Sequence, residues 1–140
     1  MKIKTKNEYG QLKSIIVGVT TQGSWPTDDL YFNKMIDAST YTQKLIRGPL
    51  STEVNNITTK ELNLLAGILE SLGIEVHRPE ITKPHWSFSP RDILLTVGDK
   101  IIECPTPYTS RRNESSLYKK LKFENLIVLP APENQHDAMF

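Results

Sequence analysis

A β-hairpin bracketed by prolines is the feature that most restricts how this 140-residue chain folds. Two apolar runs rich in β-branched residues, 93–97 and 100–104, are joined by Gly98-Asp99. Glycine at the first turn position allows positive φ, so this pattern predicts a two-residue hairpin turn. Pro90 and Pro105 suit the strand ends because proline has no N–H for the ladder. Few residues of either strand are polar, which predicts a hairpin buried on both faces.

The same stretch carries a longer motif. Pro-Arg-Asp stands at 90–92, Gly-Asp at 98–99, Ile-Ile-Glu-x-Pro at 101–105 and Ser-Arg-x-x-Glu at 110–114. The order and spacing resemble the signature of the amidinotransferases. These enzymes, which include the glycine and inosamine-phosphate amidinotransferases, belong to the guanidino-modifying superfamily with the pentein fold.

Two other stretches resemble the same family. Asn-Glu-Tyr-x-x-Leu at 7–12, followed by Ile-Ile-Val-Gly at 15–18, is similar to the family's opening segment. Gly-x-x-Val-x-Arg-Pro at 73–79 is similar to a later pattern. The resemblance implies that residues 1–140 are a single domain, the N-terminal part of an amidinotransferase-like enzyme.

The remaining elements predict an α/β chain. An apolar run at 12–17 indicates the first strand, and leucines three or four residues apart indicate a helix over about 53–72. That helix starts either at Ser51 or at a capping box, Thr58-x-x-Glu61, and Gly73 suits its end. A short strand at 74–76 follows, and later come a helix-compatible segment at 110–122 and a buried strand at 126–129.

Hairpin, helix and strand make one ββαβ unit, and the first half supplies a second, looser one. The resemblance therefore implies a partial pentein (α/β-propeller) fold, with about two ββαβ units of five. Such a part leaves strand edges and apolar helix faces uncovered, so we expect a homo-oligomer.

The segment 19–50 is irregular, with a short helix expected at 28–36. Its aromatic residues allow two interpretations, core filling and loop anchoring, or a lip over a substrate cleft. These residues are Trp25, Tyr31, Phe32 and Tyr41.

Composition narrows the function classes. A net charge of +1 gives no reason to expect nucleic acid or a membrane surface as a partner. The single cysteine excludes an internal disulfide framework and a cysteine-based zinc cluster. We expect no metal and no cofactor, and a cytoplasmic protein without a secretory signal or a membrane span.

Asp92 is the first candidate for binding substrate. A carboxylate accepts paired, charge-assisted hydrogen bonds from a planar guanidinium. From its spacing alone, Asp92 is either a cap at the strand entrance or a site residue. In the family, the aspartate of Pro-Arg-Asp contacts the guanidine, so the resemblance implies a guanidino partner such as arginine.

Asp137 and Arg111 are weaker candidates. A later family motif, Phe-Asp-Ala-Ala-Asp, supplies another guanidine-binding carboxylate, and Asp137-Ala138 keeps part of it. Alternatively, Phe140 begins that motif and Asp137 is incidental. Arg111 matches Arg-Ser-Arg-x-x-Glu only in part, because Thr109 replaces the first arginine. Arg111 therefore either contacts substrate or lies on a solvated helix face.

No catalytic residue is predicted in this chain. The family's nucleophilic cysteine lies near the end of its sequences and its histidine in a His-x-Asp motif, and neither is present here. Cys104 fills a variable slot of the hairpin motif, which indicates a small core residue. Two hypotheses follow. One is the N-terminal part of an enzyme that transfers an amidino group to an amine and is inactive alone. The other is a non-catalytic module that binds a guanidino ligand or a partner chain.

Overall fold

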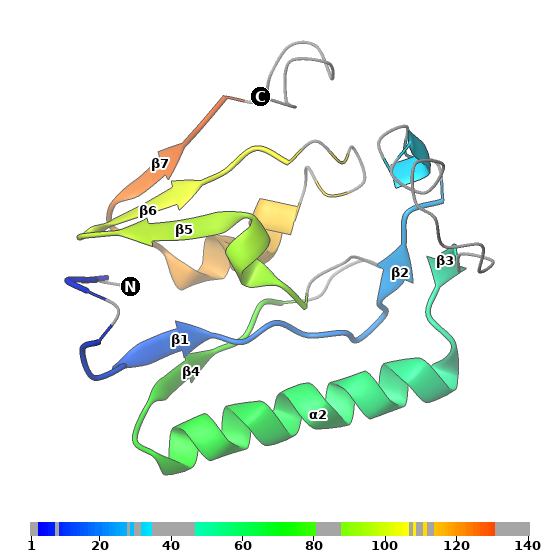
Figure 1. Ribbon diagram of the computed structural model, residues 1–140, viewed down its shortest axis with the longest axis horizontal. Helices are drawn as coiled ribbons and strands as arrows, with labels where there is room; N and C mark the ends of the chain where they lie inside the picture. Colours follow the sequence, from blue (N-terminus) through cyan, green and yellow to red (C-terminus); the bar gives the residue numbers. More distant parts are fainter. Residues whose placement is uncertain are drawn as a thin grey trace.

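The described part of the chain is an α/β arrangement with one long helix and three small sheets (Figure 1). The computed structural model describes residues 3–7, 9–27, 29, 32–34, 47–80, 88–106, 108, 111 and 114–130. The predicted α/β class is confirmed in these ranges, and the sheets remain open and small.

The first half is a β-α-β crossover. Strand β1 (Ser14–Ile16) pairs in parallel with β4 (Glu75–His77), and helix α2 (Thr52–Ser71) lies between them in the chain. Ile15 stands opposite Val76. Both strands are found where apolar runs predict them, although β1 is shorter than 12–17 and β4 is shifted by one residue from 74–76.

Helix α2 begins at the first of its two predicted caps. The Ser51 hydroxyl accepts a hydrogen bond from the Val54 N–H at 3.2 Å, which satisfies one of the free donors of the first turn. The capping box at Thr58-x-x-Glu61 is wrong. Thr58 lies inside the helix, and its hydroxyl donates to the Val54 carbonyl at 2.8 Å. Gly73, with φ +77°, follows the helix end as predicted.

The leucine stripe of α2 is only partly covered. Leu62 and Leu69 are half-buried and Ala66 is buried, whereas Leu65 and Leu72 are 46% and 68% exposed. Helical spacing located the helix correctly, but the described residues pack against only part of its apolar surface.

The second half is the predicted hairpin with a third strand. β5 (Leu94–Val97) and β6 (Lys100–Glu103) are antiparallel, and Gly98 takes φ +62° at the predicted turn. β7 (Leu126–Val128) pairs in parallel with β6 after η3 (Glu114–Leu121). The result is a ββαβ unit in which the helix is a 3₁₀ helix.

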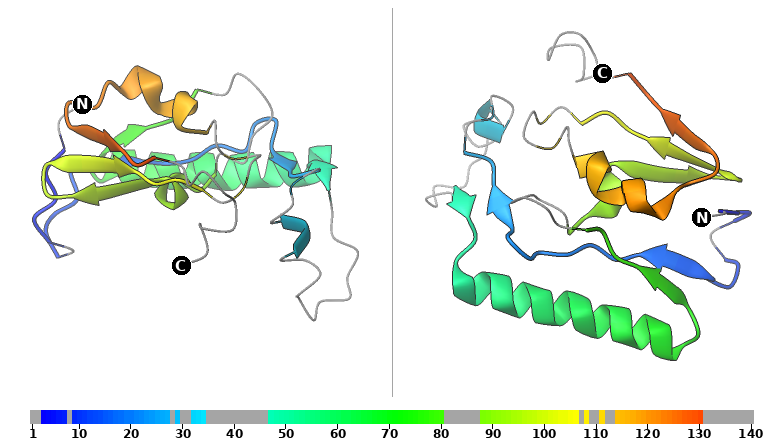
Figure 2. Two further views of the ribbon diagram at one scale, coloured as in Figure 1. Left: turned by 90° about the horizontal axis from the view of Figure 1, so that it is seen from above. Right: turned by 180° about the vertical axis from the view of Figure 1, so that it is seen from behind.

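The prediction that these strands are buried on both faces is wrong. Helix η3 lies across one face of the β5–β6–β7 sheet (Figure 2). Its Leu117 and Tyr118 pack with Ile93 in a buried cluster. The described residues place no layer on the opposite face, so Leu95 remains 51% exposed. The strand predicted to be buried, β7, is exposed as well, with Val128 at 60%.

A third, two-stranded sheet joins the loop to the start of α2. β2 (Ser24–Trp25) is antiparallel to β3 (Gly48–Pro49). Trp25 stacks on Phe32 with ring centroids 6.0 Å apart, and Phe32 is buried. Within the predicted helix at 28–36 the described residues 32–34 are helical, whereas Tyr31 and Tyr41 lie outside the described residues.

Candidate functional site

Asp92 ends a single 3₁₀ turn, η1 (Pro90–Asp92), at the entrance to β5. Pro90 occupies the first position, where its missing N–H is not needed. The Asp92 N–H bonds to the Ser89 carbonyl at 3.2 Å, and the Cys104 N–H bonds to the Ile93 carbonyl at 2.9 Å. The turn is therefore tied to the far end of the hairpin, and the carboxylate of Asp92 remains 40% exposed.

The side chain of Arg111 joins two carboxylates. Its Nη1 donates to Oδ2 of Asp92 at 2.9 Å. Its Nη2 and Nε both donate to Oε2 of Glu114, at 2.8 and 3.1 Å. Charge-assisted hydrogen bonds of this length are strong and directional. Asp92, Arg111 and Glu114 are called the acid–arginine–acid trio below.

The three side chains of the trio differ in how far they are exposed to solvent. The side chains of Arg111 and Glu114 are only 8% and 2% exposed. Burial lowers the pKa of Arg111, but the hydrogen bonds and charges of Glu114 and Asp92 outweigh burial and raise it above the ordinary value. The guanidinium is therefore permanently charged, and Asp92 is the one member of the trio that presents its charge to the surface.

The hydrophobic cluster under the sheet fixes the trio. Ile93 follows Asp92 directly, and Leu117 and Tyr118 follow Glu114 by three and four residues along η3. Burial raises the pKa of the Tyr118 phenol, and the Glu114 carboxylate adds to this effect. Apolar packing thus places the two carboxylates beside Arg111, although 19 residues separate Asp92 from it.

The structure brings together two of the three site residues predicted from sequence. Asp92 and Arg111 are in contact, whereas Asp137 lies outside the described residues. Arg111 does not lie on a solvated face. Glu114 was not predicted as a site residue, although its spacing of three residues from Arg111 in Ser-Arg-x-x-Glu was a usable signal.

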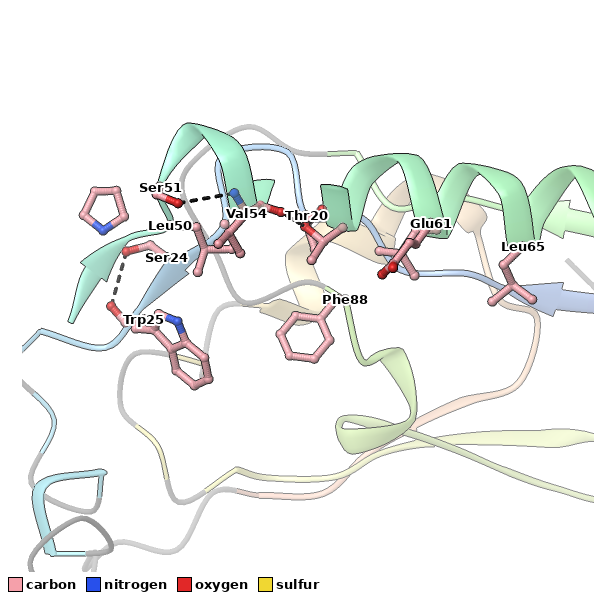
Figure 3. Close-up of a pocket in the computed structure, with 13 residues that line it drawn as sticks. Thr20, Ser24, Trp25, Leu50, Ser51, Val54, Glu61, Leu65 and Phe88 are labelled. Carbon is pink, nitrogen blue, oxygen red and sulfur yellow. Dashed lines mark hydrogen bonds between the residues drawn. The ribbon is translucent and has the colours of Figure 1, made fainter. Parts of the chain in front are cut away.

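A cavity of about 680 Å³ lies along α2, beside the β2–β3 sheet (Figure 3). Leu50, Val54 and Leu65 line one side, and Trp25 and Phe88 also face it. The volume falls in the range of small-molecule pockets. Trp25 therefore lines a cavity, whereas its stacking partner Phe32 is a core residue.

Other chemistry is sparse in the described part of the chain. Cys104 is half-buried, and its Sγ lies 3.9 Å from the Ile102 carbonyl. The described residues contain no group of three or more histidine, cysteine or acidic side chains able to hold a metal ion. Within the same ranges, no helix combines the length and the apolar character required to cross a membrane.

Known proteins that resemble the chain define one class, the amidinotransferases. It is 34% identical to inosamine-phosphate amidinotransferase 1 of Streptomyces griseus, an alignment covering 87% of this chain and 40% of that protein. It is 35% identical to the L-arginine:L-lysine amidinotransferase of Pseudomonas savastanoi pv. phaseolicola, covering 81% of this chain and 36% of that protein. The chain matches no family model.

The fold agrees. The solved structure of the Streptomyces griseus inosamine-phosphate amidinotransferase superimposes with a TM-score of 0.77 at 31% identity, over 94% of this chain and 44% of that one. In sequence and structure, the chain matches amidinotransferases over most of its length and spans 36–40% of these two curated relatives. The resemblance predicted from the Pro-Arg-Asp motif is confirmed.

Proposed function

We propose that this chain is the N-terminal part of an enzyme that transfers an amidino group from a guanidino donor such as arginine to an amine. One observation supports this most directly. The aspartate of the family motif, Asp92, presents an exposed carboxylate that Arg111 holds from beneath at 2.9 Å. A fixed carboxylate is the group best suited to bind and orient a guanidinium.

The donor class comes from the relatives. One of them is named an L-arginine:L-lysine amidinotransferase. Arginine is therefore the first donor to test, and the amine acceptor is a separate question. We propose that the reaction takes place in the cytoplasm. We also propose that the chain forms about two of the five ββαβ units of a pentein fold.

We propose that the chain alone contributes binding and not turnover. The family's late cysteine and His-x-Asp motif are absent from the sequence, and Cys104 lies at the end of a hairpin strand. A nucleophilic thiolate needs an activating partner. Residues beyond this segment of the fold would supply that chemistry. The alternative is a non-catalytic module that binds a guanidino ligand and is not part of a larger enzyme.

The experiment is an arginine titration followed by NMR or calorimetry. Asp92→Asn keeps the side-chain shape and removes the charge, so we expect arginine affinity to fall about tenfold or more, since a hydrogen bond to a charged group contributes about 1.5–3 kcal/mol. Asp99→Asn, in the exposed hairpin turn, is the matched control and should leave affinity unchanged. L-citrulline, a neutral analogue, should bind weakly to all three proteins. Equal arginine affinity in wild type and Asp92→Asn would refute the proposal.

We also propose that the chain self-associates. Apolar side chains stand exposed on α2 and on the open face of the β5–β6–β7 sheet. They include Ile57, Leu64, Ile68, Leu95 and Val97, each between 49% and 64% exposed. Leaving ~400 Å² of apolar surface in water costs about 10 kcal/mol at ~25 cal/mol/Å², which is comparable to the stability of a small domain.

Sedimentation equilibrium at low micromolar concentration tests this. We expect a mass that rises with concentration above the 15.9 kDa of one chain. Leu95→Lys places a charge on the open face of β5 and should shift the equilibrium toward the monomer. A folded species of one chain's mass at every concentration would contradict self-association.

A further inference from the structure

The acid–arginine–acid trio has a charge balance that the proposed function alone does not explain. Asp92 and Glu114 each carry one negative charge and Arg111 one positive charge. If only Arg111 and Asp92 were present, the pair would be neutral and would offer little attraction to a cationic guanidino donor. Glu114 adds a second negative charge from a position 2% exposed, below the surface. The trio keeps a net charge of −1.

We propose that Arg111 is a positioning residue for Asp92 and that buried Glu114 is a charge-balancing residue that makes the site selective for cationic guanidino ligands. This inference rests on the proposed function. Arg111 holds Oδ2 of Asp92, and the other carboxylate oxygen, Oδ1, receives the guanidinium. Glu114 compensates the charge of Arg111, so the positioning does not cancel the attraction.

The geometry explains why Arg111 acts through Asp92 and not on a ligand. Three of its donor contacts are directed at carboxylates of its own chain, two at Glu114 and one at Asp92. Its side chain is 8% exposed, whereas that of Asp92 is 40% exposed. A ligand arriving from solvent therefore reaches Asp92 first.

The hydrogen bonds of Asp92 show which of its carboxylate oxygens is available to a ligand. In the ranges that the structure describes, Arg111 is the one side chain that donates to this carboxylate, and it does so through Oδ2. Glu114 holds two other donors of the same planar guanidinium, which directs Nη1 at Oδ2 more firmly than a lysine ammonium, a point charge, would. Arg111 therefore occupies Oδ2 and leaves Oδ1 open before a ligand binds.

Two substitutions separate geometry from charge. Glu114→Gln keeps shape and removes the balancing charge, which makes the trio neutral. Arg111→Lys keeps the net charge and removes the fork. Within a protein of low effective dielectric, one unit charge a few ångströms from the ligand changes affinity by about tenfold or more. We expect both variants to lose about tenfold in L-arginine affinity, while weak L-citrulline binding stays unchanged in Glu114→Gln.

A spectroscopic readout needs no ligand. The Nη1–Hη signal of Arg111, which reports the hydrogen bond to Asp92, should exchange slowly with water in wild type and change its chemical shift in Asp92→Asn. Slow exchange reports a side chain held by its hydrogen bonds. This signal also decides the positioning role if Glu114→Gln fails to fold, since wild type and Asp92→Asn suffice. A rapidly exchanging Arg111 signal would overturn that role.

The outcomes separate the inference from the proposed function. If Asp92→Asn loses arginine affinity while folded Glu114→Gln and Arg111→Lys bind as wild type does, the function stands and the inference is overturned. If only Arg111→Lys weakens binding, the charge-balancing role fails. If Asp92→Asn binds as wild type does, or wild type does not bind arginine, both the function and the inference fail. Tenfold losses in both variants, with a slowly exchanging Arg111 signal, support the inference.

Discussion

Replacing Gly18 with alanine should destabilise the protein strongly, because a methyl group there has no room. Gly18 follows β1 and lies against the backbone of Phe88, at the approach to η1. An added Cβ would stand 2.3 Å from the Phe88 carbonyl oxygen and 2.5 Å from its Cα. Ordinary contacts between such atoms need about 3.5 Å. Both partners are backbone, so no side-chain rotation relieves the overlap.

The magnitude follows from that overlap. Inserting a methyl group into a packed site costs about 1–3 kcal/mol, and occasionally more. A backbone-to-backbone clash of about 1 Å belongs at the upper end, so we expect a loss of about 3 kcal/mol. For a chain of this length, that loss lowers Tm by roughly 10 °C.

Gly67 provides the matched control. It lies in α2, is exposed, and an added Cβ would meet no atom within 4 Å. Gly67→Ala should raise stability by about 0.5–1 kcal/mol, because alanine favours the helix interior. Urea unfolding followed by circular dichroism, at one protein concentration, measures both changes. A Gly18→Ala protein within about 0.5 kcal/mol of wild type would refute the steric argument.

Three further predictions concern chemistry, capping and pH. The isolated chain, incubated with arginine and an amine, should give no ornithine, citrulline or new guanidino product; turnover that Cys104→Ala abolishes would show that Cys104 is a nucleophile. Ser51→Ala removes the hydroxyl that accepts from the Val54 N–H and should cost about 1 kcal/mol in thermal unfolding, whereas no change would mean the cap is unimportant. Burial raises the pKa of Tyr118, so the folded state favours its neutral phenol. This contribution to the free energy of unfolding is complete below pH ~10, the ordinary tyrosine value, and is lost as pH rises further. In a pH titration followed by absorbance at 295 nm, one tyrosine should ionise at a higher pH in the folded protein than in the urea-unfolded protein. Superimposable titration curves would contradict this.

Local elements were predictable because their signals are local. The Gly98-Asp99 pair fixed the hairpin turn through the backbone freedom of glycine, and the structure has β5 and β6 on either side of it. Leucine spacing fixed α2, and Ser51 marked its start. Motif spacing also located Asp92 at the entrance to β5.

Burial was not predictable, because it depends on which layers cover a sheet. The apolar sequence of β5 suggests two covered faces, yet η3 covers one and Leu95 is left exposed. The contacts within the acid–arginine–acid trio could not be predicted from the sequence for a similar reason. Asp92 and Arg111 meet only because η1 and η3 share one apolar cluster, and no local pattern reports that packing.

The most direct test of a guanidinium site at Asp92 is carboxyl ¹³C NMR on protein labelled at its aspartates, titrated with L-arginine. The Cγ signal of Asp92 should shift saturably with arginine and not with L-citrulline, while the signal of Asp99, in the hairpin turn, stays still. A stationary Asp92 signal, with arginine shifting other aspartates or none, would contradict the assignment of Asp92 as the guanidinium-binding group.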